Sequence, residues 1–339
     1  MTPTIRDVAR EANVGLGTVS RVLNNSPQVS DTTRARVLAA AQALGFHPNV
    51  SARRLVTGQT HLIAFIERHP PEFVTSDSFW PQVLHGIHDA AVNAGIEVLF
   101  APDYKTRGEG RAGHLLRSNQ IDGAIISGPR NDDDEVLSLI AEGEPIVIQG
   151  SWPDPLVPSV DVDNHAAAYR ATEHLIELGH TRIAIIIHAP LAYTSATQRY
   201  AGYQQALKDH GIQQDPDLVA QAQLTVSSGE QAMEAILKKN AKPTALFATS
   251  DTVAFGAMAV SHRRGLEIPR DLAVVGFDDI PLAQYSRPTL TTVRLPAYRI
   301  GWTAADLLIR MGSGNGDAER ITTLETELII RESCGALTH

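Results

Sequence analysis

The sequence predicts an α/β protein with a small helical N-terminal domain, a short connecting segment and a larger body of two lobes. Residues 4–24 hold two short stretches of helical periodicity separated by a tight turn. From residue 61 onward, apolar strand-like runs alternate with helical stretches, a pattern typical of parallel sheets covered by helices. The alternation begins again after V-D-V-D-N at 160–164, which predicts two similar lobes.

Composition agrees with a chain of several globular domains. Its 339 residues are enough for two or three domains, and 43% hydrophobic residues can fill their cores. The single cysteine, Cys334, excludes an intrachain disulfide and fits a reducing cytoplasm. The N-terminus lacks an apolar signal region, and no apolar run has the length of a membrane span. We therefore expect a cytoplasmic protein with no membrane partner.

Charge is distributed unevenly along the chain, whose net charge is -9. Residues 1–60 contain seven Arg, no Lys and three acidic residues, which gives +4, and the remainder carries -13. A positive charge on residues 1–60 suits a domain that contacts the phosphates of nucleic acid, whereas the negative charge of the body would repel them.

Residues 4–24 are interpreted as a helix-turn-helix. Val8 belongs to the apolar face of the first helix, Asn13 and Gly15 bracket the turn, and the helical period resumes at 18–23. In this motif the second helix enters the DNA major groove. The alternative is an ordinary helical hairpin that caps a larger domain.

A third amphipathic helix is predicted at residues 32–44. Its apolar residues Val37, Leu38, Ala41 and Leu44 are expected to face inward.

The segment 47–60 is expected to connect the head to the body. His47-Pro48-Asn49 breaks the third helix, and 50–56 can form about two helical turns, which are marginal in isolation. A plain flexible linker is the alternative.

These segments resemble the headpiece and hinge of the LacI/GalR (lactose-repressor) family of bacterial transcription regulators. The resemblance rests on T-I-R-D-V-A, V-G-L-G-T-V-S-R-V-L-N and N-V-S-A-R-R-L. It implies a DNA-binding headpiece at 1–47, a hinge helix and linker at 48–60, and an effector-binding and dimerisation domain at 61–339. It also implies double-stranded operator DNA as a partner.

The resemblance implies which residues contact DNA. Leu16, Gly17 and Arg21 match the positions that read base edges; Arg21 can donate two hydrogen bonds to guanine, and Leu16 offers only apolar contact. Leu55 matches the leucine that wedges into the minor groove. The complete implied set is Thr4, Leu16, Gly17, Thr18, Ser20, Arg21, Asn24, Asn49, Ala52, Arg53 and Leu55.

The body is predicted from its alternating pattern. Strands are expected at 61–66, 97–101, 123–128, 145–150, 182–187, 245–249 and 273–277. Helices are expected at 79–94, about 109–118, after D-D-D-E, up to Gly179, up to Gly211, near 227–239 and from 252 to Gly265. The default ligand site of two such lobes is the cleft between them, at the carboxyl ends of the strands.

Motifs in the body resemble the same family, whose body is similar to periplasmic sugar-binding proteins. They include D-V-D-N, L-G-H-T-R-I-A, R-Y-A-G-Y, V-V-G-F-D-D and P-T-L-T-T-V-R. The resemblance implies crossings between the lobes near 162, 292 and 322. Lobe one is then 61–162 with 293–322, and lobe two is 163–292 with 323–339.

A small-molecule effector is implied for the cleft. Aromatic residues suit the C–H faces of a sugar, a planar guanidinium suits hydroxyls or a carboxylate, and Asp278 at a strand end suits vicinal hydroxyls. Each residue also has a structural alternative, such as helix capping for Asp161 or a surface salt bridge for Arg199. The implied effector-binding residues are Phe79, Trp80, Ser127, Trp152, Asp161, Ser195, Arg199, Ser250 and Asp278.

Three functions are weighed. The first is a homodimeric regulator, expected to be a repressor of carbohydrate-utilisation genes with a palindromic operator and a sugar effector; a nucleobase or nucleoside effector is its variant. The second is a sugar-binding solute receptor without a regulatory role, which the basic head and the missing signal region oppose. The third is an enzyme, but no Walker loop, G-x-S-x-G elbow or metal-ligand spacing occurs. We predict no catalytic activity, no metal and no cofactor.

Overall fold

The computed structural model separates into two compact units, residues 1–60 and 61–339, which are treated individually. It describes residues 3–23, 27–46, 59–70, 78–103, 110–130, 133–154, 157–239, 241–313 and 320–336. The predicted hinge helix falls within 47–58, outside the described residues.

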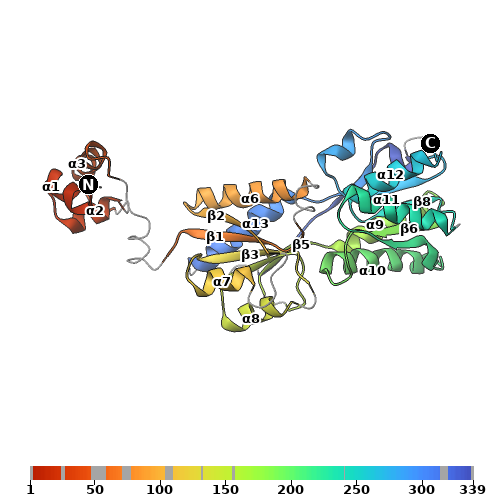
Figure 1. Ribbon diagram of the computed structural model, residues 1–339, viewed down its shortest axis with the longest axis horizontal. Coiled ribbons are helices and arrows are strands. Elements are labelled where there is room, and N and C mark those ends of the chain that lie inside the picture. The colour runs from red at the N-terminus through yellow and green to blue at the C-terminus, as the bar shows by residue number, and fades with distance from the viewer. Residues whose placement is uncertain are drawn as a thin grey trace. The chain divides into compact units, whose positions relative to one another are not determined.

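The first unit is a three-helix head in its described part (Figure 1). Its helices are α1 (Ile5–Glu11), α2 (Leu16–Leu23) and α3 (Asp31–Ala43). The Gly15 carbonyl accepts the first hydrogen bond of α2, from Val19 N–H, so Gly15 stands at the cap of that helix. Val8, Val19 and Val37, one from each helix, are fully buried against one another in a single core. The predicted helix-turn-helix is therefore present.

The prediction that Leu38 belongs to the core of the head is wrong. Leu38 is 50% exposed, whereas Val37 and Ala41 are buried. Residues three and four apart share a helix face, so Val37 and Ala41 point inward together. Leu38 lies one residue from Val37, about 100° around the helix, and leaves the core.

The second unit contains two six-stranded sheets among its described residues. The first sheet is parallel and has the order β11-β5-β4-β3-β1-β2. Its strands are β1 (Leu62–Glu67), β2 (Glu97–Pro102), β3 (Gly123–Ser127), β4 (Ile146–Gln149), β5 (Ser159–Val162) and β11 (Ile321–Leu324).

The second sheet has the order β12-β10-β9-β8-β6-β7, with β12 antiparallel to β10. Its strands are β6 (Ile183–Ile187), β7 (Val219–Gln221), β8 (Ala245–Ala248), β9 (Ala273–Asp278), β10 (Thr291–Arg294) and β12 (Glu327–Ile329). The α/β fold with two lobes is confirmed.

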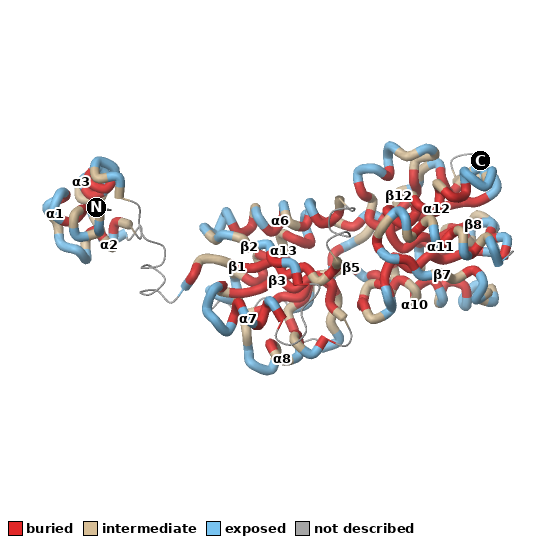
Figure 2. Tube along the Cα trace, in the orientation of Figure 1, coloured by how far each residue is buried: buried red, intermediate tan, exposed pale blue. Residues whose placement is uncertain are grey.

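Helices cover both faces of each sheet (Figures 1 and 2). The first sheet packs against α6 (Phe79–Asn93) and α13 (Ala297–Gly312) on one face and α7 (Arg111–Arg117) and α8 (Asp134–Glu142) on the other. The second packs against α9 (Asn164–Glu177) and α10 (Thr194–Asp209) on one face and α11 (Val226–Lys238) and α12 (Asp251–Arg263) on the other.

The continuous apolar strands follow from this two-sided cover. In β1, Phe65 enters the core with α6, and Ile66 enters the core with α7 and α8. Successive residues of a strand point to opposite faces, so a strand buried on both sides is apolar at every position. The tube in Figure 2 shows inner strands such as β1 and β3 buried and the outer helix faces exposed.

Helix α6 is placed by a close crossing with α13. A Cβ atom on Gly86 would lie 2.0 Å from the Tyr298 carbonyl oxygen, and one on Gly301 would lie 2.0 Å from the Val83 carbonyl oxygen. Only glycine permits this approach of the two backbones. The crossing fixes the N-terminal end of α6 and with it the aromatic pair Phe79 and Trp80.

The lobe boundaries differ from the prediction by a few residues. The chain crosses between sheets after Val162, after Arg294 and after Leu324. Residues 293–294 therefore belong to the second sheet, where they pair with β9, and 323–324 belong to the first, where they pair with β5. Strand pairing decides these boundaries, and the motifs alone do not report it.

Among the residues that the structure describes, no helix has both the length and the apolar composition of a membrane span.

Candidate functional site

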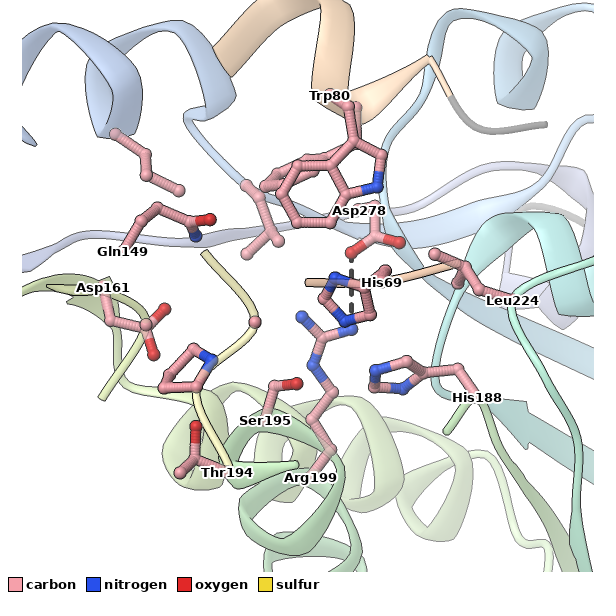
Figure 3. Close-up of a pocket in the computed structure, with 16 residues that line it drawn as sticks. His69, Trp80, Gln149, Asp161, His188, Thr194, Ser195, Arg199, Leu224 and Asp278 are labelled. Carbon is pink, nitrogen blue, oxygen red and sulfur yellow. Dashed lines mark hydrogen bonds and ion pairs between the residues drawn. The ribbon is translucent and has the colours of Figure 1, made fainter. Parts of the chain in front are cut away.

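A cavity of about 70 Å³ lies where the strand ends of the two lobes meet (Figure 3). Lobe one contributes residues that follow β1, β3 and β4, one residue of β5, the start of α6 and one residue of α13. Lobe two contributes residues at or after the ends of β6, β7 and β9 and residues from the first turns of α10. Leu295 lies between β10 and α13, where the chain crosses from lobe two to lobe one. The lining residues are His69, Phe79, Trp80, Gly128, Pro129, Gln149, Gly150, Asp161, His188, Thr194, Ser195, Arg199, Leu224, Asp278, Leu295 and Ile300.

Aromatic residues form one wall of this cavity. Phe79 and Trp80 begin α6, and their rings meet edge to face with centroids 5.1 Å apart. His69 stacks on Tyr193 of lobe two, with centroids 4.8 Å apart. The Glu67 carboxylate accepts hydrogen bonds from the backbone N–H of His69, at 2.8 Å, and from its Nδ1, at 2.6 Å. This carboxylate orients the His69 ring toward Tyr193 and the cavity.

A second part of the cavity wall is built on a buried ion pair. Arg199 Nη1 lies 3.3 Å from Asp278 Oδ1, and both side chains are less than 10% exposed. Arg199 also donates to Asn164 Oδ1 at 2.9 Å and to the Thr249 carbonyl at 2.7 Å. Its guanidinium lies 3.8 Å from the centroid of the Phe277 ring. The surface salt bridge considered for Arg199 is therefore wrong.

Asp278 occupies an unusual backbone conformation at the end of β9. Its φ is +113°, and that of Asp279 is +53°, a region that side chains other than glycine rarely adopt. The Asp279 carboxylate is held by Arg294 and Arg331, each at 2.7 Å. These ion pairs stabilise a strained turn that presents the Asp278 carboxylate to the cavity.

Asp161 faces the same cavity from the last strand before the first crossing. Its carboxylate accepts from Val162 N–H at 2.8 Å and from Asn164 Nδ2 at 3.0 Å. Burial raises the pKa of Asp161 from 3.8 to about 6, although those hydrogen bonds and the positive Arg199 act in the opposite direction. The cap of α9 is the next acidic residue, Asp163, which accepts from Ala166 N–H, so the helix cap considered for Asp161 is provided by its neighbour.

The raised pKa of Asp161 predicts a pH-dependent contribution to stability. The folded chain binds this proton more tightly than the unfolded chain, so the contribution is complete below pH 3.8 and is lost as pH rises through about 6. Relative to the parent, Asp161→Asn should therefore have a higher melting temperature at pH 8 than the difference at pH 5 would predict, because Asn replaces a buried carboxylate that is charged at pH 8. Thermal melts at the two pH values measure this difference. Equal changes at the two pH values would contradict the assignment, and Asp163→Asn is the matched control.

His188 stands at the end of β6 as a neutral group. Burial, together with the nearby positive charge of Arg199, lowers its pKa well below 6.5. Its Nδ1 lies 2.9 Å from Thr249 Oγ1. Within the described part of the chain, His, Cys, Asp and Glu form no group suited to hold a metal ion.

Six of the nine predicted effector residues meet in the cavity. They are Phe79, Trp80, Asp161, Ser195, Arg199 and Asp278.

Three predicted effector residues do not line the cavity. Ser127 is buried and donates to Gln149 Oε1 at 2.6 Å. Trp152 packs at the edge of the core beneath α7 and α8. Ser250 caps α12 by accepting from Thr252 N–H. Each of these polar or aromatic groups is used by the fold itself.

The sequence reasoning missed several lining residues, including His69, Gln149 and His188. All three lie at carboxyl ends of predicted strands, where ligands of parallel sheets bind. Applying that rule to every strand end would have found them.

In the head, the predicted base-reading residues are exposed. Leu16 is 46% exposed although it is apolar, and Gly17 and Arg21 are also exposed. Thr18 and Ser20 are partly buried. All five belong to α2.

Thr4 lies at the start of α1 rather than on α2. Its backbone N–H and its hydroxyl both donate to the Asp7 carboxylate, at 2.9 and 2.7 Å. These hydrogen bonds lower the pKa of Asp7. Thr4 thus has a capping role in the head. The remaining predicted DNA contacts lie outside the described residues and are Asn24, Asn49, Ala52, Arg53 and Leu55.

Two family models match the chain. Residues 4–49 match the model described as bacterial regulatory proteins, lacI family. Residues 172–334 match the periplasmic binding protein-like domain.

Whole-length relatives are transcription regulators. The chain is 35% identical to the HTH-type transcriptional regulator CelR of Thermobifida fusca, over 98% of each chain. It is also 35% identical to the HTH-type transcriptional repressor CytR of Escherichia coli, over 98% of this chain and 97% of the relative.

Solved structures agree with these relatives over the full length. A CelR–cellobiose complex aligns with a TM-score of 0.76 and 33% identity, over 98% of this chain and 99% of the other. A Lac repressor dimer bound to operator and the anti-inducer ONPF aligns with a TM-score of 0.86 and 27% identity, with the same coverage.

Proposed function

Because the chain belongs to the LacI family of bacterial regulatory proteins, which are transcription regulators and not enzymes, we propose a specific regulatory role for it. The protein represses carbohydrate-utilisation genes in the cytoplasm by binding a palindromic operator as a homodimer. A sugar in the interlobe cavity changes its operator affinity. The observation that carries the proposal is the cavity itself, where acidic, aromatic and hydrogen-bonding residues of both lobes converge.

The head supports sequence-specific DNA binding through α2. Leu16 and Arg21 are exposed on this helix, and the buried Val19 and Val22 anchor it to the head. Arg21 can pair with guanine, and Leu16 can contact a thymine methyl group. The hinge residues Ala52, Arg53 and Leu55 retain their proposed minor-groove role.

The volume of the cavity supports coupling between effector binding and lobe movement. Its volume of about 70 Å³ lies well below the roughly 300 Å³ at which small-molecule sites generally begin. A sugar therefore requires the lobes to separate or rotate. A ligand that binds one lobe arrangement more tightly shifts the population of that arrangement.

Exposed apolar residues of lobe two support the proposed homodimer. Leu282, in the short 3-10 helix Pro281–Gln284, is 54% exposed, and Tyr285, directly after that helix, is 69% exposed. Two heads are needed to read the two halves of a palindrome, and the structurally similar Lac repressor was solved as a dimer on its operator. We propose that the second copy of the chain packs against the surface around Leu282 and Tyr285 in the dimer.

Charged substitution of this surface is expected to give a monomer. The double variant Leu282→Asp and Tyr285→Asp places charges in an apolar interface, so light scattering after size exclusion should report half the parental mass. Leu137→Asp changes an equally exposed leucine on α8 and should remain dimeric. A variant that stays dimeric would move the interface elsewhere.

Operator selection from random DNA tests the proposed function. The purified protein should enrich a palindrome of about 14–20 base pairs, long enough to accommodate two heads. The selection is run at a fixed salt concentration, because phosphate contacts make the affinity depend on salt. Operator release is then measured with cellobiose, glucose and trehalose, and with cytidine as the nucleoside alternative. Failure to enrich any site, both alone and with the pooled compounds, would contradict the regulatory role.

A further inference from the structure

The charged groups around the cavity nearly balance. Arg199 is the one permanently cationic side chain among the lining residues, all of which the structure describes. Asp161 and Asp278 supply carboxylates from opposite lobes. The N-termini of α6 and α10 add roughly half a positive charge each. The wall therefore has no excess of positive charge with which to neutralise an anion.

Arg199 is also committed to the protein. Its Nε donates to Asn164, its Nη1 reaches both the Thr249 carbonyl and Asp278, and its flat face covers Phe277. To clamp a phosphate or carboxylate, the guanidinium would have to leave these buried partners. An anion in its place would also face the Asp278 carboxylate, which is an unfavourable contact.

The histidines do not supply the missing charge. His188 is neutral, for the reason given above. Any positive charge on His69 would be offset by the Glu67 carboxylate, whose Oε1 lies 2.6 Å from His69 Nδ1.

The N-terminus of α10 has a similar restriction. The Thr194 N–H at this end donates to the Pro129 carbonyl of lobe one at 3.3 Å. An anion could reach this N–H only after lobe movement takes the Pro129 carbonyl away from it, so the main obstacle to an anion is the charge balance of the wall.

One donor in the cavity is both buried and without a partner in the structure. Trp80 is 6% exposed, and its indole Nε1 makes no hydrogen bond. A buried N–H without an acceptor is costly, which favours a ligand that supplies one. Asp278 and Asp161 line the same cavity as acceptors (Figure 3). Hydroxyl groups satisfy such a set because each can donate and accept.

We infer that the cavity selects an uncharged, hydroxyl-rich effector and excludes its phosphorylated or carboxylated forms, with Trp80 Nε1 as a donor that determines specificity. This inference rests on the proposed effector role of the cavity. An uncharged sugar would donate hydroxyl protons to the carboxylates and accept from the indole. A sugar phosphate would accept equally well from the indole but would bring charge that the wall does not neutralise.

Matched ligands test the charge selection on the full-length protein by calorimetry. The pairs are glucose with glucose 6-phosphate, trehalose with trehalose 6-phosphate, and cellobiose with cellobionate. Every pair that binds should favour its uncharged member, and the charged member should bind at least about 100-fold more weakly. A charged member that binds as tightly as its partner, or more tightly, would overturn the inference.

Two variants test the residues. Trp80→Phe preserves the aromatic wall but removes the N–H, and should weaken the bound uncharged sugar about 10-fold. Trp152→Phe changes a tryptophan outside the cavity and should bind as the parent does. Asp278→Asn should reduce the ratio between the affinities for the uncharged and the charged sugar about 10-fold, because losing the carboxylate gives the wall a net positive charge. Parental affinity in Trp80→Phe would remove the indole from recognition.

The outcomes separate this inference from the proposed function. Tight binding of only a charged sugar that releases the operator would retain the regulator and overturn the charge selection. Binding of an uncharged sugar with no effect on operator affinity would retain the selection and contradict the regulation. No binding by any pair would count against both.

Discussion

Arg199→Ala is expected to lower the free energy of unfolding of the body by about 3–5 kcal/mol, the largest effect predicted for this protein. The substitution leaves the buried Asp278 carboxylate without its cation. It also removes the donors to Asn164 Oδ1 and the Thr249 carbonyl, both in buried surroundings. A shift of the urea unfolding midpoint to lower concentration, followed by circular dichroism, measures the loss.

Two further variants define this prediction. Arg199→Lys preserves the charge but cannot span three acceptors with one compact ammonium, so an intermediate loss is expected. Arg264→Ala removes an arginine whose ion pair with Glu234 is on the surface, and its midpoint should scarcely change. An Arg199→Ala midpoint equal to that of the parent would mean that the cavity wall is not built on this ion pair.

Arg21→Ala is expected to weaken operator binding by about 1–3 kcal/mol and to relax the preference at one base pair of each half-site. Arg21 is exposed on α2, one residue before the buried Val22 that anchors this helix in the head. Truncation therefore removes a base-reading group without opening the core. Fluorescence anisotropy with the selected operator and with its single-base variants measures both effects.

Arg36→Ala is the matched control for Arg21. It removes the same charge from an exposed position of the same head, on α3 instead of α2. Any loss of affinity should then be uniform across operator variants and should follow salt concentration. If Arg21→Ala also weakens every sequence equally, α2 does not read bases through this residue.

Local patterns predicted seven of the twelve strands in the described part of the chain and missed β5, β7, β10, β11 and β12. The period of 3.6 residues located α2 and α3, and continuous apolar runs located strands such as β1 and β9. Because these patterns arise from which faces are buried, each segment carries its own signal. The misplaced Leu38 shows the limit, since an apolar residue next to a buried one can still lie outside the contact face.

The partners of polar residues were harder to predict. Ser127, Ser250 and Asp278 all stand at or just after the end of a strand, and all were assigned to the effector. In the structure the hydroxyls of Ser127 and Ser250 bond to nearby groups of their own lobe, whereas Asp278 meets the cavity and Arg199. Ser250 finds its partner two residues away, at Thr252, whereas the partners of Ser127 and Asp278 are distant in sequence.

By itself, the sequence determined the family, the helix-turn-helix head, the two-lobed α/β body and six of the residues that line the cavity. Tertiary structure decided the rest. It placed His69 and His188 at the same cavity, buried Arg199 against Asp278, and located the lobe boundaries through the pairing of β10 and β11. Periodicity reports which face of a segment is buried, whereas ion pairs and strand neighbours depend on how distant segments pack together.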